Sequence, residues 1–444
     1  MTLTKDEILE LDRRHVWHPY TAIDDGREPL VIVADEGASF RDADGRRLLD
    51  GNSSWWAAGL GHRHPRLVRA LVAQAERLGH VSLAGLTHEP AALLAKELAE
   101  VAPPGLGRVF YSDDGSTAVE AALKLSVQYF RQTGRPGKHR FMALRGAFHG
   151  ETLGASSLGG VDLFRSGFGP LVCDVVHVPS PAPEDDAAAV SATWQQAFAR
   201  AAEEITAQRE HIAGIVVEPL VQGAAGMQIY APAYLAELRR VTAEHEVLLI
   251  ADEVFTGYGR TGTMWACDQA GVVPDLLCLG KTFSGGLLPM AATLVSERLL
   301  EGFRGGRERA FLHGHSFCGN PLGAAVAREV LAVMREEAVI EGVQKKAPRL
   351  RRAVETAARL PGVRRPRQLG MVAAVDLAEG GYLGNAGWRV YEEGLRRGAY
   401  LRPLGDTVYL APPLNIDDAD LDRLCSIYEG SIATVMGAAV MGAG

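Results

Sequence analysis

The chain has 444 residues, 47% of them hydrophobic, and a formal net charge of −8 at pH 7. This length predicts a large core and more than one domain, and the acidic balance without a basic cluster argues against nucleic acid as the main partner. The five cysteines lack the paired spacing of a metal site, no window could span a membrane, and the N-terminus has no signal pattern. We therefore expect a cytoplasmic protein with free thiols.

The first hundred residues predict a short helix over 5–14, a hairpin over 35–50, and amphipathic helices over 65–78 and 89–101. Between them stand two adjacent tryptophans, Trp55 and Trp56. On an extended segment their side chains would face opposite sides, so at least one needs a second surface to cover. A core or domain contact and a place in a substrate pocket are equally open.

An apolar strand starting at 108 turns through Gly115, Ser116 and Thr117 into a long helix. The first turn of such a helix has unpaired N–H groups and a positive dipole end, so it can hold a phosphate. The alternative is a capping box formed by Thr117 and Glu120. A second strand, 140–144, leads to Phe148, which could lie flat on a planar ring or be a core aromatic; His149 stays unassigned.

Buried strands are predicted over 212–217, 247–251 and 275–280, and residues 179–189 read as a surface loop. Asp252 and Lys281 stand at the ends of the last two strands, where parallel α/β sheets bind ligands. An amine that can hold an aldehyde and an acid that can keep a pyridine nitrogen protonated suit pyridoxal phosphate. The alternatives are a snorkelling strand-end lysine and an acid that caps a loop.

The alternation of strands and helices predicts an α/β fold with a mostly parallel sheet flanked by helices, and a smaller α+β domain. We expect an N-terminal segment over 1–60 that joins the small domain, a large cofactor domain over 61–325, and a C-terminal small domain over 326–444. Short strands are predicted around 363–377 and 400–410, and residues 433–444 are expected to fray.

Six motifs occur in order along the chain: SDDGS at 112–116, GAFHG at 146–150, VEP at 217–219, ADEV at 251–254, GYGRTG at 257–262 and LGK at 279–281. Together they resemble the class III, fold-type I pyridoxal phosphate aminotransferases. Further motifs resemble the branch that aminates 8-amino-7-oxononanoate to 7,8-diaminononanoate in biotin biosynthesis: WHPYT at 17–21, SSWW at 53–56, GLTHEP at 85–90, HG at 313–314 and LRP at 401–403.

The resemblance implies a role for each matching residue. Lys281 would bind the cofactor aldehyde and carry the proton, and Asp252 would pair with the pyridinium nitrogen. The remaining roles are a ring sandwich by Phe148 and Val254, a phosphate site at Gly115 and Ser116, and a substrate pocket lined by Tyr20, Trp55 and Arg402. The segment Gly314, His315 and Ser316 would come from a partner subunit and close the phosphate site, which makes a homodimer the functional unit. The resemblance implies no metal.

Arg402 could anchor the distant carboxylate of the oxononanoate, or be a surface charge. Related enzymes for ornithine or aminobutyrate carry a glutamate that neutralises the matching arginine, where this chain has Ala224 and Ala225. Many members of the family have Tyr in place of Phe148 and Pro-Thr in place of His315 and Ser316. Because this chain departs from that pattern, adenosylmethionine and lysine both remain candidate amino donors. Other readings are an aminotransferase for another ω-amino acid or diamine, an aminomutase, and a cofactor-binding regulator without turnover.

Overall fold

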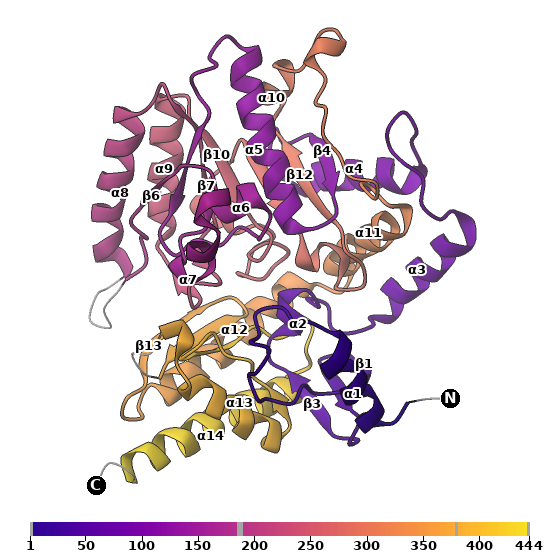
Figure 1. The fold of residues 1–444 in the computed structure, drawn as a ribbon, viewed down its shortest axis with the longest axis vertical. Coiled ribbons are helices and arrows are strands. Elements are labelled where there is room, and N and C mark those ends of the chain that lie inside the picture. Colours follow the sequence, from indigo (N-terminus) through magenta and orange to yellow (C-terminus); the bar gives the residue numbers. More distant parts are fainter. Residues whose placement is uncertain (1–2, 184–189, 378–380, 442–444) are drawn as a thin grey trace.

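A seven-stranded sheet forms the centre of the large domain (Figure 1). The computed structural model describes residues 3–183, 190–377 and 381–441. All neighbouring strands run parallel except β12, which is antiparallel to both of its neighbours. This sheet confirms the predicted fold class. In spatial order its strands are β4 (Arg108–Ser112), β12 (Ala291–Val295), β11 (Leu276–Leu279), β10 (Leu248–Asp252), β7 (Ile212–Val217), β5 (Arg140–Leu144) and β6 (Val175–Val178).

The central strands are apolar throughout because helices cover both faces of the sheet. Leu248 and Ile250 of β10 point into one apolar cluster, and Leu249 and Ala251 point into the other. The first cluster includes α5 (Gly115–Gln132) and α6 (Leu153–Leu158). The second includes α4 (Glu89–Val101), α8 (Val190–Ala207) and α9 (Pro232–Glu244). The two-residue side-chain period of the strands thus assigns each residue to one of the two layers.

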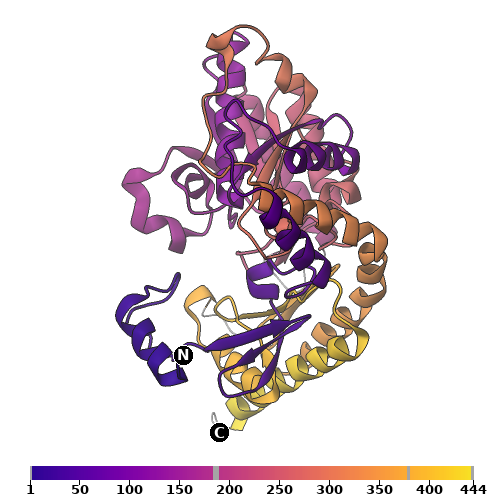
Figure 2. The same ribbon diagram turned by 90° about the vertical axis from the view of Figure 1, so that its right-hand side faces the viewer.

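Both ends of the chain build the smaller domain, where the N-terminal strands and the C-terminal helices lie together below the large sheet in Figures 1 and 2. One sheet has the order β1-β2-β3-β15 and the other β13-β14-β16. The strands are β1 (Ile32–Glu36), β2 (Ser39–Asp42), β3 (Arg47–Asp50), β15 (Ala399–Tyr400), β13 (Arg364–Leu369), β14 (Val372–Asp376) and β16 (Thr407–Leu410). The helices are α12 (Val339–Ala357), α13 (Ala386–Arg397) and α14 (Asp418–Met441).

Most predicted local elements form. The helices α1 (Lys5–His15), α3 (Pro65–Arg77) and α4 and the β2–β3 hairpin are confirmed, with β1 as an additional partner of β2. The prediction that 433–444 frays is wrong as far as Met441, because α14 continues to that residue and buries Val435 and Met436. Residues 442–444, and residues 184–189 of the predicted surface loop, lie outside the described residues.

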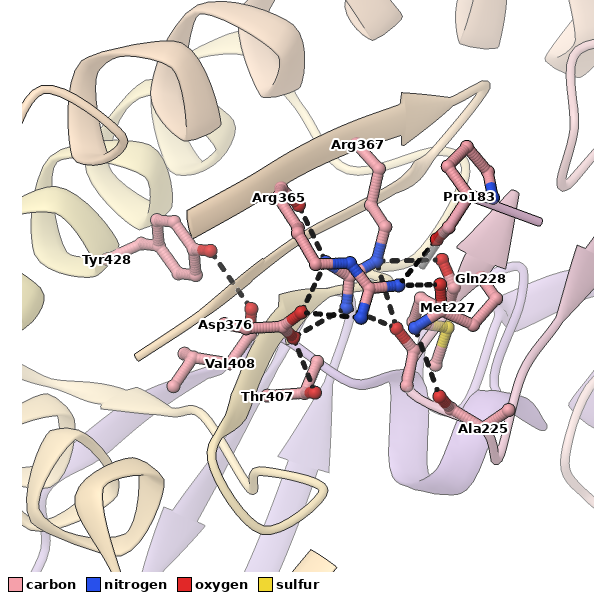
Figure 3. Close-up of polar contacts among 11 residues, drawn as sticks. Pro183, Ala225, Met227, Gln228, Arg365, Arg367, Asp376, Thr407, Val408 and Tyr428 are labelled. Atoms are coloured by element: carbon pink, nitrogen blue, oxygen red, sulfur yellow. Dashed lines mark hydrogen bonds and ion pairs between the residues drawn. The ribbon is translucent and has the colours of Figure 1, made fainter. Parts of the chain in front are cut away.

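A polar clamp joins the two domains (Figure 3). Arg367 of β13 donates from Nε to the carbonyl oxygens of Gly226 and Met227, at 3.0 and 3.1 Å. Its guanidinium also pairs with Asp376 at 2.8 Å, and Asp376 accepts a hydrogen bond from Thr407 Oγ1 at 2.7 Å. The loop between the short strands β8 (Val221–Gln222) and β9 (Gln228–Ile229) is therefore held against the small domain.

The helix α11 (Pro321–Glu336) packs on α3 and α4 and then leads into α12. The remaining short helices are α2 (Ser53–Trp56), α7 (Asp162–Arg165) and α10 (Glu297–Glu301). Among the described residues, no helix combines the length and the apolar character needed to cross a bilayer.

Candidate active site

Asp252 and Lys281 stand at the ends of neighbouring parallel strands, as the sequence predicts. Asp252 is the last residue of β10, and Lys281 follows Gly280 directly after β11. The two strands are in register through Asp252 and Cys278. Both side chains therefore reach the same edge of the sheet, beyond its carboxyl ends.

A cavity of about 420 Å³ opens at this edge. It includes six of the predicted residues, Gly115, Ser116, Phe148, Asp252, Val254 and Lys281. Its volume lies in the range of small-molecule and cofactor sites. The other residues of the wall were given no cofactor role by the sequence; among them are Trp56, His149, Glu218, Phe255 and Ser284.

Asp252 is held in one orientation by two hydrogen bonds. Its Oδ2 lies 2.7 Å from His149 Nδ1, and its Oδ1 accepts the Val254 N–H at 3.1 Å. A carboxylate can only accept, so His149 donates from Nδ1. His149 Nε2 is buried without a hydrogen-bond partner. Asp252 is therefore a buried hydrogen-bond acceptor of fixed orientation at the cavity. Such a carboxylate can stabilise the protonated form of a basic nitrogen.

Lys281 is reachable from the cavity and has a lowered pKa. Burial lowers the pKa of this amine, and the charges of Asp252 and Glu218 oppose the shift without cancelling it. The Nζ atom lies 5.1 Å from the centroid of the Trp56 ring. The backbone of Lys281 has φ 51°, a left-handed conformation that favours glycine. A raised fraction of neutral amine suits a nucleophile.

Glu218 is a second buried acid at the cavity. Its Oε1 accepts the N–H of Phe148 at 3.0 Å, and its Oε2 accepts the N–H of Gly223 at 2.8 Å. Burial, reinforced by the charge of Asp252, raises the pKa of Glu218 to about 7, although His149 and the two N–H donors oppose the shift. Glu218 therefore fixes the backbone that carries Phe148.

The start of α5 forms another part of the cavity wall. Asp114 caps this helix by accepting the Thr117 N–H at 2.9 Å, and the Thr117 hydroxyl completes a capping box. The predicted pair of Thr117 and Glu120 is wrong, because Glu120 instead accepts the Gly154 N–H at 2.6 Å. At the first two helical positions, Gly115 and Ser116, the N–H groups have no partner within the helix.

Gly115 allows close packing at this helix start. A Cβ on Gly115 would lie 2.6 Å from Val254 Cγ1, so any side chain there would collide with a residue of the cavity wall. The Ser116 hydroxyl accepts the Thr152 N–H at 2.9 Å, which ties α5 to the start of α6. Two donors at a positive dipole end can hold a phosphate.

The predicted substrate residues meet in an outer group. The guanidinium carbon of Arg402 lies 4.7 Å from the centroid of the Trp55 ring, and the Tyr20 ring lies 5.3 Å from the same ring. Phe164 joins this group to the cavity, since its ring contacts those of Tyr20 and Phe148 at 5.6 and 5.9 Å. A chain of ring contacts therefore connects the outer group to Phe148 in the cavity wall.

The two tryptophans lie on a turn that the sequence did not predict. Ser53, Ser54, Trp55 and Trp56 have φ values of 49°, 44°, 60° and 72°, so all four are left-handed although none is glycine. Each such residue costs roughly 1–2 kcal/mol. The expectation for an extended segment is wrong, yet the two rings do separate. Trp56 is buried against Phe255, with the centroids 4.5 Å apart, while Trp55 is 40% exposed.

Gly314, His315 and Ser316 are not among the residues that line the cavity of their own chain. His315 Nδ1 lies 3.3 Å from Asp113 Oδ2, next to the start of α5. The ligand atoms of Asp113, His315 and Cys318 come within 4.8 Å of one another, and all three residues are partly exposed. Within one chain, the segment thus lies beside the start of α5 without lining the cavity.

The chain matches the family described as aminotransferase class-III over residues 20–432. It belongs to that family. A curated relative from Nitratidesulfovibrio vulgaris, named adenosylmethionine-8-amino-7-oxononanoate aminotransferase, is 43% identical over 96% of this chain and 82% of its own length. A relative of the same name from Geobacter sulfurreducens is 41% identical over 97% of this chain and 98% of its own length.

Solved structures agree with this assignment. The adenosylmethionine-8-amino-7-oxononanoate aminotransferase of Methanocaldococcus jannaschii superposes with a TM-score of 0.91 at 33% identity, over 97% of this chain and 99% of its own. An (S)-enantioselective ω-transaminase from Thermomicrobium roseum gives 0.94 at 29% identity, over 98% and 100%. The fold of this class-III aminotransferase is therefore shared by enzymes named for different substrates.

Three residues of this aminotransferase site escaped the sequence reasoning. His149 was left unassigned because a lone histidine gives no pairing signal. In the sequence, Glu218 stands out only as part of the VEP motif, although an acid directly after a buried aliphatic strand is the same signal that points to Asp252. Trp56 could not be separated from Trp55, because the turn that divides them depends on contacts with distant parts of the chain.

Proposed function

We propose that this class-III aminotransferase binds pyridoxal 5′-phosphate in the cavity and uses it to transfer amino groups. The residues present fit the group: a reachable amine of lowered pKa at Lys281, a fixed carboxylate at Asp252, and two N–H donors at Gly115 and Ser116. When bound, the cofactor supplies an electron sink that lets a bond beside an amine be broken.

The chain's own groups would divide the work. Lys281 binds the aldehyde and then moves the proton, for which a neutral amine is needed. Asp252, held by His149, keeps the proton on the pyridine nitrogen. Phe148 and Val254, both in the cavity wall, cover the ring, while Glu218 fixes the backbone of Phe148. The start of α5 holds the phosphate.

The acceptor we propose is 8-amino-7-oxononanoate, the substrate of biotin biosynthesis named in the relatives. The observation that carries this choice is Arg402, which stacks on Trp55 in the outer group. Among the described residues, no carboxylate forms an ion pair with its guanidinium, and the loop after Glu218 carries Ala224 and Ala225 instead of an acid. A guanidinium without a carboxylate partner, oriented by the Trp55 ring and a hydrogen bond with Tyr382, is a suitable anchor for a carboxylate far from the reacting ketone.

The amino donor we propose is adenosylmethionine, with lysine as the alternative. Adenosylmethionine stands in the names of the relatives. A second candidate function is transamination of another ω-amine or diamine. It is favoured by the likeness to the Thermomicrobium roseum ω-transaminase. Both functions use the same cavity and differ only at the outer group, so the acceptor decides between them.

We further propose a homodimer, in which Gly314, His315 and Ser316 close the phosphate site of the partner. Two observations support it. The segment lies beside the phosphate end without lining its own cavity. Leu312 and Phe317, which flank it, are 92% and 59% exposed, and such apolar side chains favour a protein contact. We expect the dimer to act in the cytoplasm.

The half-reactions test this proposal. The purified protein, loaded with pyridoxal 5′-phosphate, is mixed separately with adenosylmethionine and with lysine, and the absorbance of the cofactor is followed as it accepts the amino group. Addition of 8-amino-7-oxononanoate should restore the original spectrum and yield 7,8-diaminononanoate by mass spectrometry. If a donor changes the cofactor spectrum but 8-amino-7-oxononanoate does not restore it, transamination of another ω-amine or diamine is favoured. Rearrangement of one substrate without a donor would indicate an aminomutase, and no spectral change with any amine would indicate a regulator.

A further inference from the structure

The left-handed turn at 53–56 rests on one buried carboxylate that the proposed function does not use. Asp50 ends β3 and is fully buried. Its Oδ1 accepts the Asn52 N–H at 2.9 Å, and its Oδ2 accepts the Ser54 N–H at 2.6 Å. Two backbone donors at the entry of the turn are thus satisfied by one side chain. Because L-residues avoid this backbone conformation, the surroundings must hold it in place.

A histidine fixes Asp50 from the other side. His62 Nε2 lies 2.9 Å from Asp50 Oδ2, and its Nδ1 lies 3.5 Å from Asp35 Oδ2. Burial opposes the charged form of His62, but the hydrogen bond and charge of Asp50, with Asp35, raise the pKa of the imidazole. Backbone hydrogen bonds in both directions between His62 and Gly37 anchor this histidine to the small domain. The carboxylate therefore cannot rotate away from the turn.

The turn contacts both parts of the site, the outer group and the cavity. Trp55 carries the stacked guanidinium of Arg402, and Trp56 faces Lys281 and Phe255. Asn52 adds a direct link, since its Oδ1 accepts the backbone N–H of Arg402 at 2.7 Å. Trp56 is also fixed by a hydrogen bond from Nε1 to the Tyr409 hydroxyl at 3.1 Å. The substrate anchor and the wall beside the lysine thus share one support.

We propose that Asp50 is a positioning residue for substrate recognition, because it holds the left-handed turn that presents Trp55 to Arg402 and Trp56 to Lys281. It touches neither substrate nor cofactor and acts through the backbone N–H groups of Asn52 and Ser54. The inference rests on the proposed function, in which Arg402 binds the carboxylate of the acceptor. Its structural part, the control of the turn by Asp50, is independent of the substrate.

The test variant is Asp50→Asn, which keeps the shape but places an NH₂ group where an acceptor is needed. The KM for 8-amino-7-oxononanoate should rise at least about tenfold, the effect of losing a charge-assisted hydrogen bond. The donor half-reaction should change less. Near-UV circular dichroism of the substrate-free protein should also change, because two of the six tryptophans lie on the turn. Adding Ser54→Gly should return both quantities toward wild type, since glycine adopts a positive φ freely.

The matched control is Asp42→Asn. Asp42 is also buried and also accepts two backbone N–H groups, from Asp44 and Arg46, but it lies in the hairpin turn away from the cavity. Asp42→Asn should lower the melting temperature of the protein without raising the KM for 8-amino-7-oxononanoate. If Asp50→Asn lowers stability in the same way, with unchanged KM and dichroism and no rescue by Ser54→Gly, the positioning role is overturned.

Two further outcomes have a defined meaning. Should Asp50→Asn not fold, Ser54→Val strains the turn from its exposed side and must raise KM, or the proposal fails. Should wild-type protein not aminate 8-amino-7-oxononanoate at all, the substrate assignment fails. The dichroism change and its rescue then decide the structural claim alone.

Discussion

His149 Nδ1 donates a 2.7 Å hydrogen bond to Asp252 Oδ2, and both side chains are buried at the cavity. This contact orients the carboxylate that would hold the cofactor's pyridine nitrogen. The sequence places the two residues 103 positions apart. We therefore expect the activity of the site to depend on His149, although this histidine carries no catalytic proton.

The first prediction concerns this histidine. His149→Ala removes the hydrogen bond and leaves Asp252 buried with one donor, so we expect weaker cofactor binding and a fall in kcat of roughly tenfold or more. His149→Asn, which can still donate from an amide, should recover part of the loss. Equilibrium titration with pyridoxal 5′-phosphate, followed by absorbance, measures it. Unchanged affinity and kcat in the alanine variant would contradict the role.

A second prediction concerns the anchor. Arg402→Ala should raise the KM for 8-amino-7-oxononanoate by roughly 30- to 100-fold, because a charged hydrogen-bonded partner of the carboxylate is lost. Arg402→Lys keeps the positive charge but lacks the planar guanidinium. Its KM for 8-amino-7-oxononanoate should therefore lie between those of the wild type and Arg402→Ala. The donor half-reaction, measured on the same preparations, serves as the internal control. Equal damage to both half-reactions would argue against a specific carboxylate site.

Subunit exchange tests the origin of Ser316. Lys281→Ala and Ser316→Ala are each expected to be impaired as pure dimers. In a hybrid dimer, the subunit with Lys281 intact receives Ser316 from its partner if the segment acts across the interface. Mixing and reassociating the two variants should then restore activity at one site per hybrid. No restoration would mean that each chain supplies its own Ser316.

Stability should depend on pH through Glu253, which is buried and accepts hydrogen bonds from Thr256 Oγ1 and the Cys267 N–H. Burial raises the pKa of Glu253 from 4.5 to about 7, against the pull of these donors. Between these values the folded state binds a proton that the unfolded state has lost. The free energy of unfolding therefore falls as pH rises through this window, by about 3 kcal/mol in full.

Glu253→Gln should reduce that fall, because the amide cannot titrate, while Glu218 still titrates in the same window. The exposed Glu355→Gln serves as the control and should leave the slope unchanged. Urea unfolding of the cofactor-free protein at several pH values between 4.5 and 7 measures the difference. Identical slopes in wild type and Glu253→Gln would contradict the assignment.

The sequence predicted those parts of the site that depend on local patterns. Short aliphatic runs predicted β7, β10 and β11, and the polar residues at the ends of β10 and β11 followed from them. The sequence did not predict contacts between separate segments, such as Asp50 with His62 or Trp55 with Arg402. The left-handed turn was unpredictable for the same reason. Two serines and two tryptophans have no local preference for positive φ, so the turn depends on tertiary contacts, such as those of Ser54 with Asp50 and of Ser53 with the Ala411 carbonyl.

Lys281 is the central residue of the proposed function, and trapping the bound cofactor tests its role most directly. The chain has seven lysines, all in the described part of the structure, and Lys281 is the one that lines the cavity. Borohydride reduction of the cofactor-loaded protein, followed by proteolysis and peptide mass spectrometry, should find the reduced pyridoxyl group on Lys281 alone. Attachment to another lysine, or none at full loading, would contradict the central assignment.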